Sequence, residues 1–112
     1  MRFIATEIGF EEGMGGASNA ASEEEYHYLA FGLQEDPQQP GNSAIYFEFD
    51  DQSNGDIDRV VKVVVGARSV DFVLREGRTI GVDGRRCEPD WAAWVSRVRE
   101  VFGQRVVEMV GE

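Results

Sequence analysis

Four β-rich runs joined by short polar links fill the stretch from Tyr26 to Arg75, and they constrain the fold more than any other feature. The runs at Tyr26–Gln34 and Ala44–Asp50 alternate apolar and polar residues, which is typical of antiparallel strands with one wet face. Arg59–Val65 is almost continuously apolar, so we expect it near the centre of the sheet. Ser69–Arg75 follows a tight turn and alternates again. Together these runs predict a meander of hairpins.

The segments before and between these runs differ in character. Arg2–Glu12 alternates in the same way and predicts a further strand. The glycine-rich segment Gly13–Asn19 predicts a loop, and Ser22–Glu25 fits one helical turn. Glu35–Asn42 contains two prolines, which lack the ladder donor of a central strand, so it predicts an exposed connection. Asp51–Asp58 contains an Asn-Gly pair and predicts a turn-rich loop.

The periodicity changes after a short strand predicted at Arg78–Val82. Between Trp91 and Phe102 the apolar residues recur at helical spacing and predict one buried stripe. The stripe consists of Trp91, Trp94, Val95, Val98, Val101 and Phe102. Pro89 suits the first helical turn, and Gly103 suits the helix end. Packing of the two tryptophans against the sheet is favoured over a ligand platform. A last short strand is predicted at Arg105–Val110.

The length and composition agree with one globular domain over residues 1–112. The chain has 112 residues, of which 42% are hydrophobic and 29% charged; these are ordinary values for a folded domain. We therefore expect the α+β class. The predicted architecture is an antiparallel meander sheet of five or six strands with one C-terminal amphipathic helix packed on one face.

Charge is distributed unevenly along the chain. Residues 1–58 carry one basic and thirteen acidic side chains, whereas residues 59–112 carry ten basic and eight acidic ones. An acidic half repels phosphates, so we do not expect nucleic-acid binding. The same charge would attract a basic partner and speed the encounter. The alternative is an acidic surface that only keeps the protein in solution.

The sequence also bears on the compartment and on redox chemistry. Cys87 is the one cysteine, so no internal disulfide can form. No signal-peptide pattern and no apolar run of the length of a membrane helix is present, so we expect a cytoplasmic protein without membrane contact. The neighbouring Arg85 and Arg86 could activate the Cys87 thiol, but a packed or surface thiol is the favoured interpretation.

Patterns typical of catalysis or metal binding are weak. His27 is the one histidine, and no nucleophile elbow is present, so we expect neither an enzyme nor a cofactor. Asp50–Asp58 resembles a calcium loop at its first, fifth, sixth and ninth positions. The third position is Gln52 and the twelfth is Val61, where the bidentate glutamate belongs. An acidic hairpin turn without metal is therefore the favoured interpretation.

Several motifs follow one another along the chain. They are Tyr28-Leu29 with Gln34 and an acidic loop, Tyr46-Phe47-Glu48 with a short acidic turn, two hydrophobic strands (Val60–Val65 and Val70–Leu74), and an aromatic-ended helix, Trp91–Phe102. Together these motifs resemble the immunity protein 10 family of bacterial polymorphic-toxin systems. The resemblance spans roughly residues 26–102. It implies a non-enzymatic antidote that binds and blocks a protein toxin made by the same cell or its kin.

An acidic surface in the N-terminal half is the predicted binding site for this toxin, which we expect to be basic if it acts on nucleic acid. The predicted partner-binding residues are Glu35, Asp36, Tyr46, Glu48, Asp50, Asp51, Asp56 and Asp58. Tyr46 would act as an aromatic anchor among the carboxylates. The alternative is a small-ligand-binding or catalytic α+β domain whose pocket lies between the sheet and the Trp91–Phe102 helix.

Overall fold

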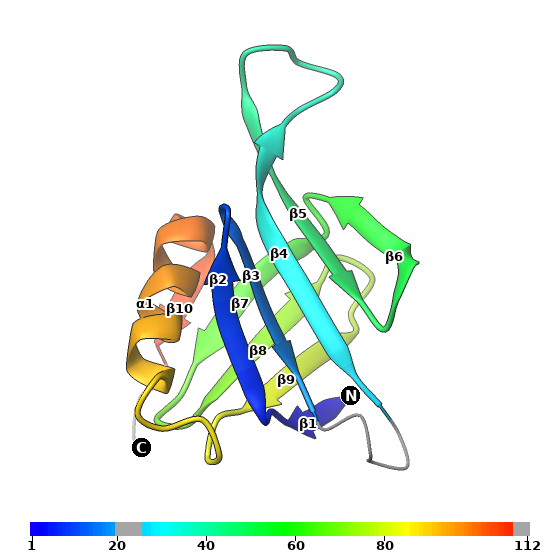
Figure 1. Ribbon diagram of the computed structural model, residues 1–112. Helices are drawn as coiled ribbons and strands as arrows, with labels where there is room; N and C mark the ends of the chain where they lie inside the picture. The colour runs from blue at the N-terminus through cyan, green and yellow to red at the C-terminus, as the bar shows by residue number, and fades with distance from the viewer. Residues whose placement is uncertain (20–25, 109–112) are drawn as a thin grey trace.

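The computed structural model of the chain describes residues 1–19 and 26–108. These residues form two five-stranded sheets packed face to face, with one α-helix along an open side (Figure 1). The elements are β1 (Arg2–Ile4), β2 (Glu7–Glu11), β3 (Met14–Ser18), β4 (Tyr28–Glu35), β5 (Ser43–Phe49), β6 (Asp51–Ile57), β7 (Val60–Val65), β8 (Ser69–Leu74), β9 (Thr79–Asp83), α1 (Trp91–Phe102), a 3₁₀ turn (Gly103–Arg105) and β10 (Val106–Glu108). The expected α+β class with a C-terminal helix is confirmed.

The strands divide between two sheets, where the sequence suggested one sheet of five or six strands. The front sheet of Figure 1 has the order β2-β3-β4-β5-β6 and is an antiparallel meander throughout. The rear sheet has the order β1-β9-β8-β7-β10. In the rear sheet β1 pairs parallel with β9, and β10 pairs parallel with β7. Alternation shows which face of a strand is buried but not which sheet the strand joins, so it could not reveal this division.

The N-terminal segment departs most from expectation. Arg2–Glu12 is two strands, because the chain leaves the rear sheet after β1 and enters the front sheet at β2. The loop predicted at Gly13–Asn19 is wrong, since Met14–Ser18 forms β3. Glu12 and Gly13 have φ of 52° and 83°, as a two-residue hairpin turn requires. A Cβ at Gly15 would lie 2.5 Å from the Phe10 ring, so glycine at this position makes room for packing.

The acidic segment after β5 is also more regular than expected. The turn-rich loop predicted at Asp51–Asp58 is wrong, because Asp51–Ile57 forms β6 and pairs with β5 through an irregular register. The chain reverses instead at Asp50 and Asp58, whose φ values are 61° and 53°. A Cβ at Gly55 would collide with the Tyr46 hydroxyl, so Gly55 allows the Tyr46 ring to lie against β6. The Asn54-Gly55 pair therefore lies within strand β6, where Gly55 packs against Tyr46, and it does not form a hairpin turn.

The core joins the two sheets and the helix. Phe31 and Phe47 of the front sheet contact Phe72 of the rear sheet, with ring centroids 5.7 and 5.2 Å apart. From α1, Trp94 and Phe102 pack on Phe31 at 5.8 and 5.3 Å. The predicted helix bounds are confirmed, and the stripe residues are buried except for the partly buried Val101. The two tryptophans are thus core residues.

The ends of the helix agree only in part with the sequence analysis. Gly103 terminates α1 with φ of 54°, as expected. Pro89 was expected in the first turn, but it precedes the N-cap residue Asp90. The final strand, β10, covers the described part of the predicted Arg105–Val110 strand, whereas the turn predicted at Ser22–Glu25 lies outside the described residues. No helix in the described ranges is both long and apolar enough to cross a membrane.

Candidate functional site

The front sheet is built from the acidic half of the chain, and most of the rear sheet is built from the more basic half. All strands of the front sheet lie between residues 7 and 57, and the sequence has no lysine or arginine between Arg2 and Arg59. Strands β7 to β10 come from the more basic second half. Because the inner face of the front sheet forms the core, its charges lie on the outer face and at the loops. This outer face is therefore the acidic face of the molecule.

Strand pairing arranges the outward residues of the front sheet in rows. Leu29, Phe31 and Phe47 point into the core, so the alternate positions on β4 and β5 point outward. Three rows cross the sheet: Glu7–Ser18–Tyr28, Gly9–Gly16–Ala30–Glu48 and Glu11–Met14–Gly32–Tyr46. The middle row consists of two glycines and an alanine before it reaches Glu48. Gly9, Gly16 and Ala30 therefore form a floor without large side chains, and the longer side chains of the other two rows lie on either side of it.

Tyr28, Tyr46 and Glu48 form a hydrogen-bonded unit on this face, here called the tyrosine–glutamate cluster. The Tyr28 hydroxyl donates to Glu48 Oε2 at 2.5 Å, and the Tyr46 hydroxyl donates to Glu48 Oε1 at 2.9 Å. Burial raises the pKa of Tyr28 and of Tyr46 above the usual value of 10.0, and the hydrogen bond to Glu48 raises it further. Both hydroxyls therefore stay protonated at neutral pH. Each carboxylate oxygen keeps further acceptor capacity for a partner.

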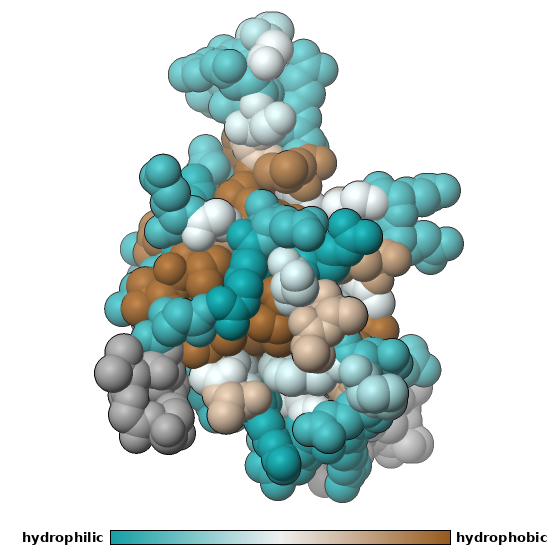
Figure 2. Space-filling view, turned by 90° about the vertical axis from the view of Figure 1, so that its left-hand side faces the viewer, coloured by the Kyte–Doolittle hydropathy of each residue, from teal (hydrophilic) through white to brown (hydrophobic). Residues whose placement is uncertain are grey.

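Two of the predicted binding residues, Glu35 and Asp36, lie on the β4–β5 hairpin. Figure 1 shows this hairpin reaching beyond the rest of the molecule, and Figure 2 shows its tip as a hydrophilic projection. Asp36 accepts a hydrogen bond from the Gln38 N–H at 2.9 Å, and Glu35 accepts one from the Gly41 N–H at 3.4 Å. The two carboxylates therefore order the loop, while Glu35 stays exposed and Asp36 stays partly exposed to a partner.

Asp50 and Asp51 lie at the end of β5, close to the tyrosine–glutamate cluster. Asp50 accepts from the Tyr28 N–H at 3.2 Å, and its second oxygen lies 3.0 Å from His27 Nδ1. The Ser53 backbone N–H donates to Asp51 at 2.9 Å, and this bond holds the pKa of Asp51 below its usual range. These two residues extend the negative charge of the cluster.

Asp56 and Asp58 differ from the other predicted residues because arginines of the second half neutralise them. Arg75 forms an ion pair with Asp56, and this bond holds the pKa of Asp56 below its usual range. Arg105 donates to Asp58 at 3.2 Å. These pairs link the end of the front sheet to residues around the rear sheet. The structure thus brings Tyr46, Glu48, Asp50 and Asp51 together. It puts Glu35 and Asp36 on the projecting hairpin. Asp56 and Asp58 form ion pairs with arginines of the same chain.

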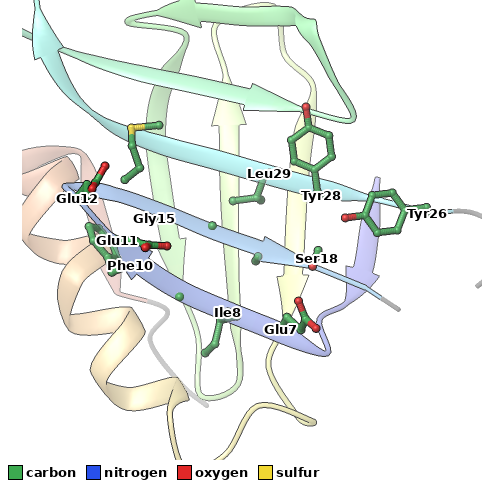
Figure 3. Close-up of a pocket in the computed structure, with 14 residues that line it drawn as sticks. Glu7, Ile8, Phe10, Glu11, Glu12, Gly15, Ser18, Tyr26, Tyr28 and Leu29 are labelled. Atoms are coloured by element: carbon green, nitrogen blue, oxygen red, sulfur yellow. The ribbon is translucent and has the colours of Figure 1, made fainter. Parts of the chain in front are cut away.

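An open hollow over β2 and β3 is a further feature of the acidic face, and the sequence analysis missed it. Its volume is about 680 Å³, and its lining includes Gly9 and Gly16 of the middle row. Figure 3 shows Glu7 at one end with Tyr26 and Tyr28 across the strands from it, and Glu11 with Glu12 at the other end. The tyrosine rings stack with centroids 6.3 Å apart. The loop predicted at Gly13–Asn19 concealed this site, although alternation through Glu7, Gly9 and Glu11 already indicated an outward face.

Other candidate sites have little capacity for chemistry. Cys87 is buried, its Sγ lies 3.3 Å from the Ala5 carbonyl oxygen, and burial raises the pKa of its thiol; it therefore fits the packed-thiol interpretation. The calcium-like segment is mostly strand β6, and its carboxylates bond to separate partners. Across residues 1–19 and 26–108, no three histidine, cysteine or acidic side chains gather as metal ligands would.

Pockets beside the helix, where the ligand-binding alternative places its site, are small. One lies between α1 and β2, has a volume of about 240 Å³ and is lined by residues that include Phe10, Trp94 and Arg97. Another has a volume of about 260 Å³ and is lined by residues that include Val65 and Trp91. Small-molecule sites typically enclose roughly 300–1,000 Å³. Arg97 also lies over the Phe10 ring at 5.7 Å. Both pockets are therefore smaller than a typical small-molecule site.

Comparison with known proteins identifies no relative of the chain. No protein-family model matches its sequence. No curated protein and no solved structure shows a significant match. The function is therefore inferred from the strand motifs together with the chemistry and geometry of the acidic face.

Proposed function

We propose that the protein is a cytoplasmic immunity protein that binds a cognate bacterial polymorphic toxin and neutralises it through the acidic face of the front sheet. The observation that carries this proposal is the tyrosine–glutamate cluster. Tyr28, Tyr46 and Glu48 belong to the strand motifs that resemble the immunity protein 10 family, and they lie on adjacent strands with their side chains bonded to one another. They point outward, whereas their neighbours Leu29 and Phe47 form the core.

The composition of the acidic face suits protein recognition. Aromatic side chains that are held in place before binding lose little conformational freedom on association, and tyrosines are enriched among the residues that dominate binding energies. Each tyrosine of the cluster is held by Glu48, and Tyr46 also lies against Gly55. We therefore infer that Tyr46 acts as an anchor and that the surrounding carboxylates orient the partner.

The charge of the acidic face indicates the chemistry of the partner. A toxin that acts on nucleic acid must hold phosphates and is expected to have a basic active site. An acidic antidote can cover such a site and is steered to it by long-range attraction. Binding of this kind needs no cofactor and no reaction, so we propose a non-enzymatic inhibitor.

The test is the affinity for the protein encoded by the adjacent gene, measured as salt rises from low to physiological concentration. We expect tight binding that weakens with salt, because charge steering is screened over about 8 Å at physiological ionic strength. Tyr46→Ala should weaken binding by at least about 2 kcal/mol and mainly speed dissociation, as loss of an anchor does. Glu88→Lys, at an exposed carboxylate that precedes α1, serves as the control.

The decisive variant combines Glu48→Lys with Asp51→Lys, which reverses two charges at the centre of the proposed surface. We expect loss of binding and loss of protection when the adjacent protein is expressed in the same cells. If the double variant keeps both its affinity and its protection, the acidic face is not the binding site.

A further inference from the structure

The hollow over β2 and β3 exists because small residues, mainly glycines, occupy its floor. In the middle row, Gly9, Gly16 and Ala30 lie side by side on three strands, so the floor bears no side chain larger than a methyl group. Neighbouring strands are about 4.8 Å apart, so this floor extends roughly 10 Å across the sheet. Tyr28 forms a wall that the hollow shares with the tyrosine–glutamate cluster. A partner bound at the cluster would therefore reach the hollow directly.

The carboxylates around the hollow are available to a partner. Glu7, Glu11 and Glu12 are exposed, and none of their side-chain carboxylates has a hydrogen bond or ion pair with another residue of the described ranges. Asp56 and Asp58, by contrast, are paired with arginines. The hollow thus combines unneutralised negative charge with an apolar floor and stacked tyrosine rings.

The spacing of these carboxylates limits what can bind. Glu7 and Glu11 are four residues apart on one strand, which corresponds to about 13 Å. A metal ion needs its oxygen ligands at about 2.0–2.6 Å, so these two residues cannot share one ion. Nucleic acid would be repelled. A long basic side chain fits well, since its methylene stem can lie on the floor while its charged end reaches a carboxylate and a tyrosine face.

We propose that the hollow receives a lysine or arginine side chain of an extended segment of the partner protein. This proposal rests on the proposed function and extends it, because it assigns the β2–β3 hairpin to the interface and gives the partner segment its chemistry. Glu7 lies at one end of the hollow, and Glu11 and Glu12 lie at the other. The segment therefore runs along the strands and brings basic residues to both ends.

Filling the hollow tests this proposal without disturbing the fold. A Cβ at Gly9 would meet no atom within 4 Å, so we expect Gly9→Leu to put a side chain into the hollow without a clash at its Cβ. Thr79→Leu is the matched control, because it adds the same side chain to an exposed strand position of the rear sheet. Urea unfolding of both variants checks that the fold is retained.

The first probe is a capped peptide in which arginine alternates with glycine, and a second peptide carries uncharged citrulline in place of arginine. Both are titrated into isotope-labelled protein and followed by amide chemical shifts. We expect the arginine peptide to perturb residues of the hollow, to bind more weakly as salt rises, and to lose at least about tenfold in affinity in Gly9→Leu but not in Thr79→Leu. Perturbation elsewhere, equal binding of the citrulline peptide, equal binding of spermidine in the hollow, or unchanged affinity in Gly9→Leu would overturn the proposal.

The second probe is the protein encoded by the adjacent gene, and it separates this inference from the proposed function. We expect Gly9→Leu to weaken its binding at least about tenfold, and the combination of Glu48→Lys with Asp51→Lys to abolish it. If the double variant abolishes binding while Gly9→Leu has no effect, the hollow has no role and the proposed function stands. If the adjacent protein does not bind at all, the proposed function fails, and the peptide titration still decides whether the hollow takes basic side chains.

Discussion

At the scale of single residues, the tyrosine–glutamate cluster depends on the alternation of two neighbouring strands. Tyr28 and Tyr46 point outward while Leu29 and Phe47 point into the core, and the register brings both hydroxyls to Glu48. The alternation within the Ala44–Asp50 run predicted the outward position of Tyr46 and Glu48. It could not predict that Tyr28 joins them, because strand register is not visible in the sequence of one strand.

Ionisation of the tyrosines offers a test of the cluster. In the folded protein, burial and then Glu48 raise the pKa of Tyr28 and of Tyr46 above 10.0. A raised pKa in the folded state stabilises the fold below pH 10, and this contribution is lost as pH rises further. We expect Glu48→Gln to lower the pKa of both tyrosines toward 10 without reaching it, because burial remains. Tyrosinate absorbance during alkaline titration measures this change, and an unchanged titration curve would mean that Glu48 does not control these hydroxyls.

At the scale of elements, the strands that the sequence predicted are those with apolar alternation, and the strands it missed are rich in glycine or acidic residues. Strand propensity disfavours the glycine-rich β3 and the acidic β6. Both segments are strands nevertheless, and Gly15 and Gly55 lie where a neighbouring aromatic ring leaves no room for a larger side chain. Gly15 leaves space for the Phe10 and Phe31 rings, whose centroids are 5.6 Å apart, and Gly55 leaves space for Tyr46. The hollow was missed together with β3. Such packing relations cannot be predicted before the tertiary structure is known.

A matched pair of glycine substitutions tests this account of β3. Gly15→Ala should destabilise the protein by about 1–3 kcal/mol, the usual cost of overpacking, since its Cβ would lie within 2.8 Å of both aromatic rings. Gly9→Ala on β2 meets no atom within 4 Å, so it should be neutral or stabilise by up to about 1 kcal/mol. Urea unfolding measures both values. Equal effects at the two positions would show that packing around Gly15 is not what demands a glycine.

At the scale of the whole molecule, one core joins two sheets of different charge. Trp94 and Phe102 of α1 reach Phe31 of the front sheet, and Phe102 also reaches Phe72 of the rear sheet. The amphipathic stripe predicted the buried face of the helix, and the composition predicted the charge asymmetry. The division into two sheets turns the charge asymmetry of the sequence into an acidic outer face, because the strands of the front sheet all come from the acidic half of the chain.

Because the core is continuous, we expect the two sheets and the helix to unfold together. Trp94→Ala should lower the free energy of unfolding by about 3–5 kcal/mol, as truncation of a large core aromatic does. Unfolding followed by tryptophan fluorescence and by far-ultraviolet circular dichroism should give coincident transitions in the wild-type protein. Separate transitions would indicate that the front and rear sheets are stabilised independently.

Carboxyl footprinting shows directly whether the acidic face of the front sheet contacts the proposed partner. Carbodiimide labelling of exposed carboxylates is compared between the free protein and its complex with the protein encoded by the adjacent gene. We expect reduced labelling at Glu7, Glu11 and Glu48, with unchanged labelling at Glu88 and Glu100 outside that face. Protection of Glu88 and Glu100 with full labelling of Glu7, Glu11 and Glu48 would contradict it.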